Sequence, residues 1–81
     1  MRDESVLGRI DELVDEEHRL RSQLAAGVIS SAEEQARLRT VAEQLDQCWD
    51  LLRRRRAARS EGQPDDVVEP RPVEEVERYL Q

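Results

Sequence analysis

The chain has 81 residues, and its 19 acidic and 13 basic residues, the latter all arginine, give a net charge of −6. A chain this short buries a small core and usually needs a metal, disulfides or an oligomer, but the single Cys48 excludes an intrachain disulfide framework. One Cys and one His also exclude a zinc site that this chain builds alone from those residue types. A charged fraction of 40% with only three glycines and three prolines is typical of long helices.

Residues 3–26 are predicted to form the first helix. Apolar side chains recur at spacings of three and four residues: Val6, Ile10, Leu13, Leu20 and Leu24. Glu17 occupies the one missing step, and we interpret it as an ion-pair partner of Arg21 one turn later rather than as a polar layer that selects partners. Gly27 fits the helix end, because glycine reaches the left-handed backbone conformation without a Cβ clash.

Residues 31–60 are predicted to form the second helix. Ser30 and Glu33 make a capping box at its start, and Ser31 with Glu34 offers the same box one residue later. Gly62 is a stop signal after its end. The apolar repeat again has spacings of three and four: Leu38, Val41, Leu45, Cys48 and Leu52. At Arg55 the same repeat turns from apolar to cationic.

The short connection between these segments predicts an antiparallel helical hairpin, similar to a coiled coil, over residues 1–61. Folding about that loop pairs positions whose numbers add to about 58. Leu13 then lies by Leu45, and Asp3 lies by Arg55 as a surface ion pair that contributes about 0–1 kcal/mol. The predicted fold class is therefore all-α.

Residues 62–81 are predicted to form a C-terminal arm. Pro70 and Pro72 enforce an extended stretch, and a short helix over about 72–80 follows it. Three apolar residues share one face of that helix: Val73, Val76 and Leu80.

The basic cluster near the end of the second helix has two interpretations. Its arginines either contact nucleic acid or a nucleotide, as a regulator would, or pair with carboxylates of the protein itself. The arginines concerned are Arg53, Arg54, Arg56 and Arg59. The negative overall charge and the lack of aromatic residues interleaved for base stacking favour pairing, with Asp3, Glu4, Asp50 and the acidic C-terminal tail as partners.

A carboxylate and histidine metal site is a second alternative function. Asp15 and His18 have the i, i+3 spacing of helical di-iron bundles, and Glu17 and Glu43 would be the further carboxylates in a dimer. One His per chain makes this pattern weak, so we expect no metal.

Cys48 lies on the apolar repeat far from His18, which favours a buried thiol over a nucleophile. We expect no cofactor, no catalytic residue and no enzyme activity.

Several short segments resemble a family of small actinobacterial proteins known only as a domain of unknown function. The likeness rests on LDQCWDLLR at 45–53, on 12–14 and 16–18, and on 71–72, 76–77 and 79–81. It spans nearly the whole chain. The resemblance implies a small stand-alone bacterial protein and carries over no catalytic or ligand-binding residue.

Both helices carry more apolar surface than one hairpin covers. Leu7 and Val14 flank the first repeat, and Ala42, Trp49 and Leu51 flank the second. Because large apolar patches are rarely left exposed on monomers, we expect a homodimer, with the arm docked near Trp49 on its own hairpin or its partner's.

The predicted function is that of a non-enzymatic helical interaction protein that self-associates and binds another, unidentified protein. Four residues are candidate anchors for the arm or a partner: Trp49, Leu51, Tyr79 and Leu80. No apolar run approaches the roughly 20 residues of a membrane span, and the N-terminus lacks a signal-peptide core. We therefore expect a cytoplasmic protein that does not enter a membrane.

Overall fold

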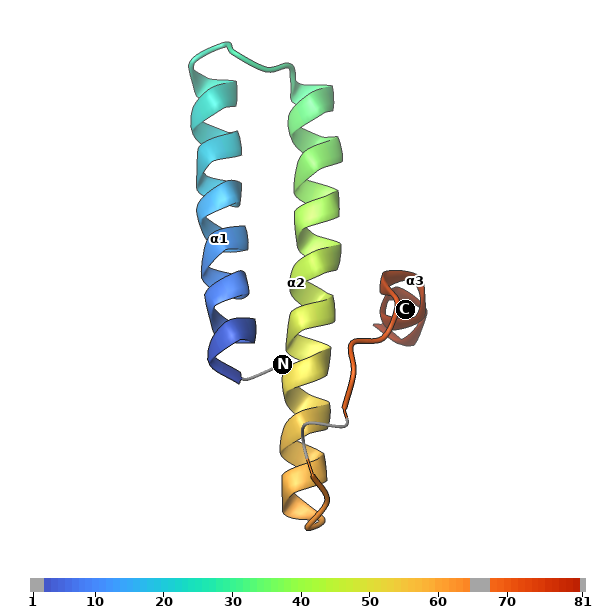
Figure 1. Cartoon of the computed structure of the whole chain (residues 1–81). Helices are drawn as coiled ribbons and strands as arrows, with labels where there is room; N and C mark the ends of the chain where they lie inside the picture. The colour runs from blue at the N-terminus through green and yellow to red at the C-terminus, as the bar shows by residue number, and fades with distance from the viewer. Residues whose placement is uncertain (1–2, 65–67, 81) are drawn as a thin grey trace.

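A computed structural model of the chain describes residues 3–64 and 68–80. These residues form three helices and no strand: α1 (Asp3–Ala25), α2 (Ser31–Ser60) and α3 (Val73–Leu80). Figure 1 shows α1 and α2 as an antiparallel hairpin, which confirms the predicted all-α fold. The predicted hairpin and arm also include residues 1–2, 65–67 and 81, which lie outside the described residues.

The ends of the long helices follow from local chemistry. Ser30 caps α2, because its Oγ accepts the backbone N–H of Glu33 at 3.1 Å. Gly27 and Gly62 end the two helices at φ of 74° and 76°. The residue after each glycine donates its backbone N–H to the carbonyl five residues earlier, Val28 to Gln23 and Gln63 to Ala58. These bonds satisfy carbonyl groups of the last helical turn that have no partner within the helix.

The hairpin core consists of two neighbouring clusters. The first holds buried Val6, Ile10, Leu51 and Leu52, with Leu45, Cys48 and Val68 packed against them. The second holds buried Leu13, Leu20, Ile29 and Val41, with Leu24, Leu38, Leu45 and Cys48 packed against them. Every residue of the two predicted apolar repeats is present. The loop residue Ile29 and the arm residue Val68 were not expected there.

The predicted register of the hairpin is confirmed by Asp3 and Arg55. Arg55 Nε donates to Asp3 Oδ1 at 2.6 Å, and Arg59 Nη2 lies 2.8 Å from the other carboxylate oxygen. The expectation of a surface pair was wrong, because Arg55 is only 4% exposed. The arginine stem continues the apolar repeat inside the hairpin, while its guanidinium reaches the carboxylate at the start of α1.

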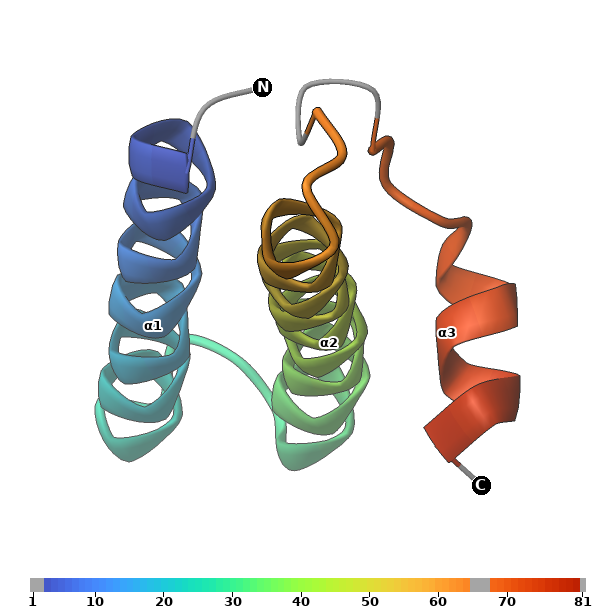
Figure 2. The same ribbon diagram turned by 90° about the horizontal axis from the view of Figure 1, so that it is seen from below.

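The three helices form a flat layer, with Cα extents of 51 × 26 × 13 Å and α2 between its neighbours (Figure 1). The arm returns along α2 on the side away from α1. Helix α3 is seen end-on in Figure 1 and from the side in Figure 2, so its axis runs across the layer from one broad face to the other. None of the helices among the described residues is both long and apolar enough to cross a membrane.

Candidate functional site

The flat layer has two broad faces, and helical geometry assigns the α1 residues to them. Leu7 and Val14 each follow a buried residue directly, so they lie on one flank of the buried stripe. Arg9 directly precedes buried Ile10, so it lies on the opposite flank. The first flank therefore carries two large apolar side chains, and the opposite flank carries an arginine.

The flanks of α2 follow from its contacts with Arg9. Arg9 Nη2 donates to Gln44 Oε1 at 3.4 Å, so Gln44 lies on the same broad face as Arg9. Ala42 and Trp49, two turns apart, project from the opposite flank of α2. They therefore share a face with Leu7 and Val14.

Helix α3 extends this apolar face. Leu80 and Trp49 line one hollow of about 200 Å³ at the edge of α2, together with Arg53 and Arg56. The arm thus docks near Trp49, as the sequence predicted, and it does so on its own hairpin. We call the exposed apolar set the Trp49 face: Leu7, Val14, Ala42, Trp49 and Leu80. Trp49 and Leu80 are each 49% exposed and Leu7 is 46% exposed, so much of their apolar surface meets solvent.

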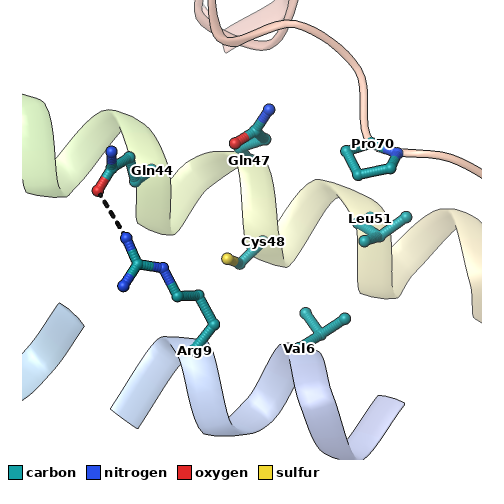
Figure 3. A pocket seen from close by; sticks show the side chains of 7 residues that line it. All are labelled: Val6, Arg9, Gln44, Gln47, Cys48, Leu51 and Pro70. Atoms are coloured by element: carbon teal, nitrogen blue, oxygen red, sulfur yellow. Dashed lines mark hydrogen bonds between the residues drawn. The ribbon is translucent and has the colours of Figure 1, made fainter. Parts of the chain in front are cut away.

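The opposite face holds a hollow of about 310 Å³ between α1, α2 and the arm (Figure 3). Its lining is Val6, Arg9, Gln44, Gln47, Cys48, Leu51 and Pro70. Burial raises the pKa of the Cys48 thiol, which keeps it protonated and a poor nucleophile at neutral pH. Leu51, an expected anchor, is 2% exposed and belongs to the core beneath this hollow.

A buried carboxylate attaches the arm to α2. Asp50 is 2% exposed, and both of its oxygens accept hydrogen bonds from the guanidinium of Arg71. These bonds hold the pKa of Asp50 below its usual value and raise that of Arg71. Gln47 Nε2 donates to the Arg71 carbonyl and Arg54 Nη1 to the Glu69 carbonyl, each at 2.8 Å. The arm is therefore fixed by polar bonds as well as by buried Val76.

The arginines of the basic cluster have different surroundings. Arg59 pairs with Asp3, while Arg53 and Arg54 lie 3.8 Å from the Asp50 oxygens. The bonds from Arg55 and Arg59 lower the pKa of Asp3. Arg56 forms no ion pair with the described residues and remains exposed beside Trp49.

A pair of acidic groups also lies between α2 and α3. Glu77 of α3 is half-buried and shares a hydrogen bond with Asp46 of α2. This bond raises the pKa of Glu77, and burial and the nearby charge of Glu43 raise it further.

Tyr79, another expected anchor, is 72% exposed, and the Arg71 guanidinium carbon lies 5.4 Å from the centre of its ring. Most of Tyr79 therefore meets solvent, although its side chain lines an open hollow with Arg53 and Arg54 of α2.

The residues of the metal alternative are not arranged as a ligand set. Asp15 and His18 are exposed on α1 and line a shallow hollow with Arg19. Glu17 lies 3.9 Å from Arg21, the ion pair expected from its sequence. Within 3–64 and 68–80, no three His, Cys, Asp or Glu residues are placed to hold a metal ion.

Sequence reasoning missed the bond between Asp50 and Arg71. Asp50 was expected to pair with the basic cluster of its own helix, and Arg71 was not considered as a partner. The sequence does contain a signal for this bond, because Asp50 directly precedes Leu51 and Leu52. A charged residue within a buried stretch needs a partner of opposite charge.

A family model with the description "Protein of unknown function (DUF2630)" matches residues 2–81. The chain belongs to this family. The match confirms the resemblance drawn from the LDQCWDLLR stretch and the C-terminal ending. Similar relatives include "Uncharacterized protein Rv0898c" of Mycobacterium tuberculosis and "Uncharacterized protein Mb0922c" of Mycobacterium bovis. Each is 49% identical over 77 residues, which cover 95% of this chain and 88% of the relative. No solved structure matches the chain.

Proposed function

We propose that this protein is a non-enzymatic helical interaction module that forms a homodimer through the Trp49 face. The observation that carries the proposal is the half-exposed state of apolar residues that share one side of the layer. Leu7 and Val14 lie two helical turns apart on α1, and Ala42 and Trp49 lie two turns apart on α2. Such paired stripes are what a second helical hairpin packs against in a four-helix bundle.

The arm leaves most of this face open. Helix α3 has eight residues, and its C-terminal Leu80 reaches the hollow beside Trp49. Leu7 and Val14 belong to α1, on the other side of α2 from α3. The arm therefore covers one edge, while a second copy is large enough to cover both stripes.

The chemistry of the remaining groups supports a binding role over catalysis. The Cys48 thiol has a raised pKa, and the shortest ion pairs among the described residues, at Asp3 and Asp50, join the helices and arm of one chain. Binding of a second, different protein stays a prediction.

The mass of the protein in solution tests the dimer. We expect light scattering during gel filtration at micromolar concentration to give twice the 9.4 kDa chain mass. Val14→Glu places a charge on the Trp49 face and should give the single-chain mass. Val28→Glu is the matched control, since Val28 is a 69% exposed loop residue away from that face, and it should leave the dimer intact. A wild-type mass near 9.4 kDa would refute the proposal.

A further inference from the structure

We propose that, in the dimer, α1 of each chain lies against α2 of its partner about a two-fold axis parallel to the hairpin. This inference rests on the proposed dimer through the Trp49 face and adds which helices meet and at what register. It follows from the charges on the two helices and from the geometry of a two-fold axis.

The two ends of the hairpin that lie side by side carry opposite charge. Residues 3–14 of α1 hold four carboxylates and one arginine, whereas residues 46–60 of α2 hold five arginines and two aspartates. On the Trp49 side these include exposed Glu4 and Asp11 from α1 and exposed Arg53 and Arg56 from α2. In a two-fold symmetric dimer the same surface is used by both chains. The acidic half of each chain can therefore meet the basic half of the other, which gives two equivalent contacts.

Two ways of stacking the layers face to face differ in which helices meet. An axis parallel to the helices places α1 on the partner's α2, so the acidic half of α1 lies on the basic half of α2. An axis perpendicular to the helices places α1 on the partner's α1, so acidic residues 3–14 meet a helix that is also acidic overall. Like charges across an interface oppose binding, which favours the parallel axis.

The parallel axis also fixes the register, because a two-fold rotation allows no sliding along its own axis. Residues at one height in the hairpin then face the same height in the partner. Asp3 lies level with Arg55, as their 2.6 Å contact shows. Leu7 therefore lies at a height between the partner's Arg53 and the partner's Trp49. Glu4, one turn before Leu7, comes level with the partner's Arg53.

Packing at this register covers the exposed apolar groups. The half-exposed ring of Trp49 meets the partner's Leu7, and Val14 lies near the height of the partner's Ala42. One like-charged approach is present, since Asp11 comes level with the partner's Asp46. Asp46 shares a hydrogen bond with Glu77 of its own arm, on the outer edge of the contact.

Charge reversal at Glu4 and Arg53 tests the register. Glu4→Arg alone brings two arginines together at each end of the dimer, and Arg53→Glu alone brings two glutamates together. We expect sedimentation equilibrium to show a dimer dissociation constant raised about ten- to a hundredfold for either variant, because each reversal acts twice across a two-fold axis.

A mixture of the two variants gives the decisive measurement. In the mixed dimer, the arginine introduced by Glu4→Arg in one chain would face the glutamate introduced by Arg53→Glu in the other. The second contact keeps its natural Glu4 and Arg53. We therefore expect the 1:1 mixture of the two variants to regain the wild-type dissociation constant. This recovery also shows that both variants remain folded.

Two matched controls reverse charge on the other side of the helices. Glu12 lies 3.1 Å from Arg9, and Arg37 lines a hollow with Arg9 and Gln44, so both lie on the face opposite Trp49. Glu12→Arg and Arg37→Glu should each dimerise like the wild type. A dimeric wild type whose Glu4→Arg and Arg53→Glu variants also dimerise normally would refute the register and leave the proposed dimer standing. A mixture that stays monomeric would refute the register as well. A monomeric wild type would refute both proposals.

Discussion

Asp50 shows how one side chain decides the position of a whole segment. A carboxylate that is 2% exposed needs partners, because transfer of an unpaired charge out of water is costly. Arg71 supplies two donors from the arm, in the forked geometry that a guanidinium offers a carboxylate. Residues 68–80 are therefore held against α2 by a specific contact, in addition to apolar packing.

Replacing Arg71 with Met should loosen the arm. Arg71→Met keeps most of the side-chain stem but removes both donors to Asp50, and hydrogen bonds to charged groups contribute about 1.5–3 kcal/mol. Amide hydrogen exchange in α3 should speed up by a corresponding factor, while exchange in α1 stays unchanged. Arg78→Met, at an exposed position of α3, is the control and should leave α3 protected. Equal protection in both variants would contradict the role given to Arg71.

The attachment at Asp50 should weaken in acid. Its pKa is held below the usual 3.8, chiefly by the bonds from Arg71, so the folded state favours the charged form. The stability that this group contributes is present above pH 3.8 and is lost as the pH falls through the lowered pKa. Protection of α3 from hydrogen exchange should fall in that range in the wild type. In Arg71→Met the fall should be smaller.

Glu77 should have the opposite pH dependence. Its pKa is raised by the hydrogen bond to Asp46, so the contribution of this pair is full below the usual 4.5 and is lost as the pH rises through the raised value. Glu77→Gln keeps a donor to Asp46 without a charge, so it should raise the urea midpoint at pH 7. The gain should shrink as the pH falls towards 4.5. Glu74→Gln, on the exposed side of α3, is the control and should leave the urea midpoint unchanged both at pH 7 and near pH 4.5.

At the scale of the elements, α2 is the helix on which the others depend. One side of α2 packs its apolar repeat against α1, and the other side presents Asp50 and Gln47 to the arm. The side of α2 that contacts the arm does so through polar side chains, so it leaves no apolar stripe in the sequence. This explains why the apolar repeat of α2 predicted its contact with α1 but not the polar contact with the arm.

The hairpin contact is tested by truncating one buried residue of α1. Leu13 is fully buried in the second cluster, so Leu13→Ala loses its burial and leaves a cavity, at a cost of about 2–5 kcal/mol. Val28→Ala is the control at a mostly exposed position and should cost under about 0.5 kcal/mol. Urea unfolding at one fixed protein concentration measures both changes. Similar shifts for the two variants would mean that Leu13 is not in the core.

At the scale of the whole molecule, the flat layer decides the shape of the dimer. Stacking two layers on the Trp49 face adds to the 13 Å dimension and leaves the 51 Å length unchanged. With helix axes about 10 Å apart across the interface, the radius of gyration should rise by only about 1 Å from the 15.2 Å of one chain. Small-angle X-ray scattering of the dimer measures this change. A dimer joined end to end would show a far larger rise and a longer maximum dimension.

Much of the fold was predictable because its determinants are local in the sequence. The capping residue Ser30 and the positive-φ residues Gly27 and Gly62 define the helix ends within one residue of the predictions. The short loop and the apolar spacings then allow one antiparallel register, which brings Asp3 to Arg55. The candidate surface was partly predictable for the same reason, since Leu7 and Trp49 are placed by helical phase.

The sequence by itself determined the three helices, the hairpin register and the surplus of apolar residues on one face, because each follows from spacing along a helix. Only the tertiary structure decided that Arg55 is buried, that Leu51 lies in the core and that Arg71 is the partner of Asp50. With 19 carboxylates and 13 arginines, the sequence allows many pairings of similar energy. The path of the arm along α2 selects among them, because it buries Asp50 and a buried carboxylate requires a partner at that place.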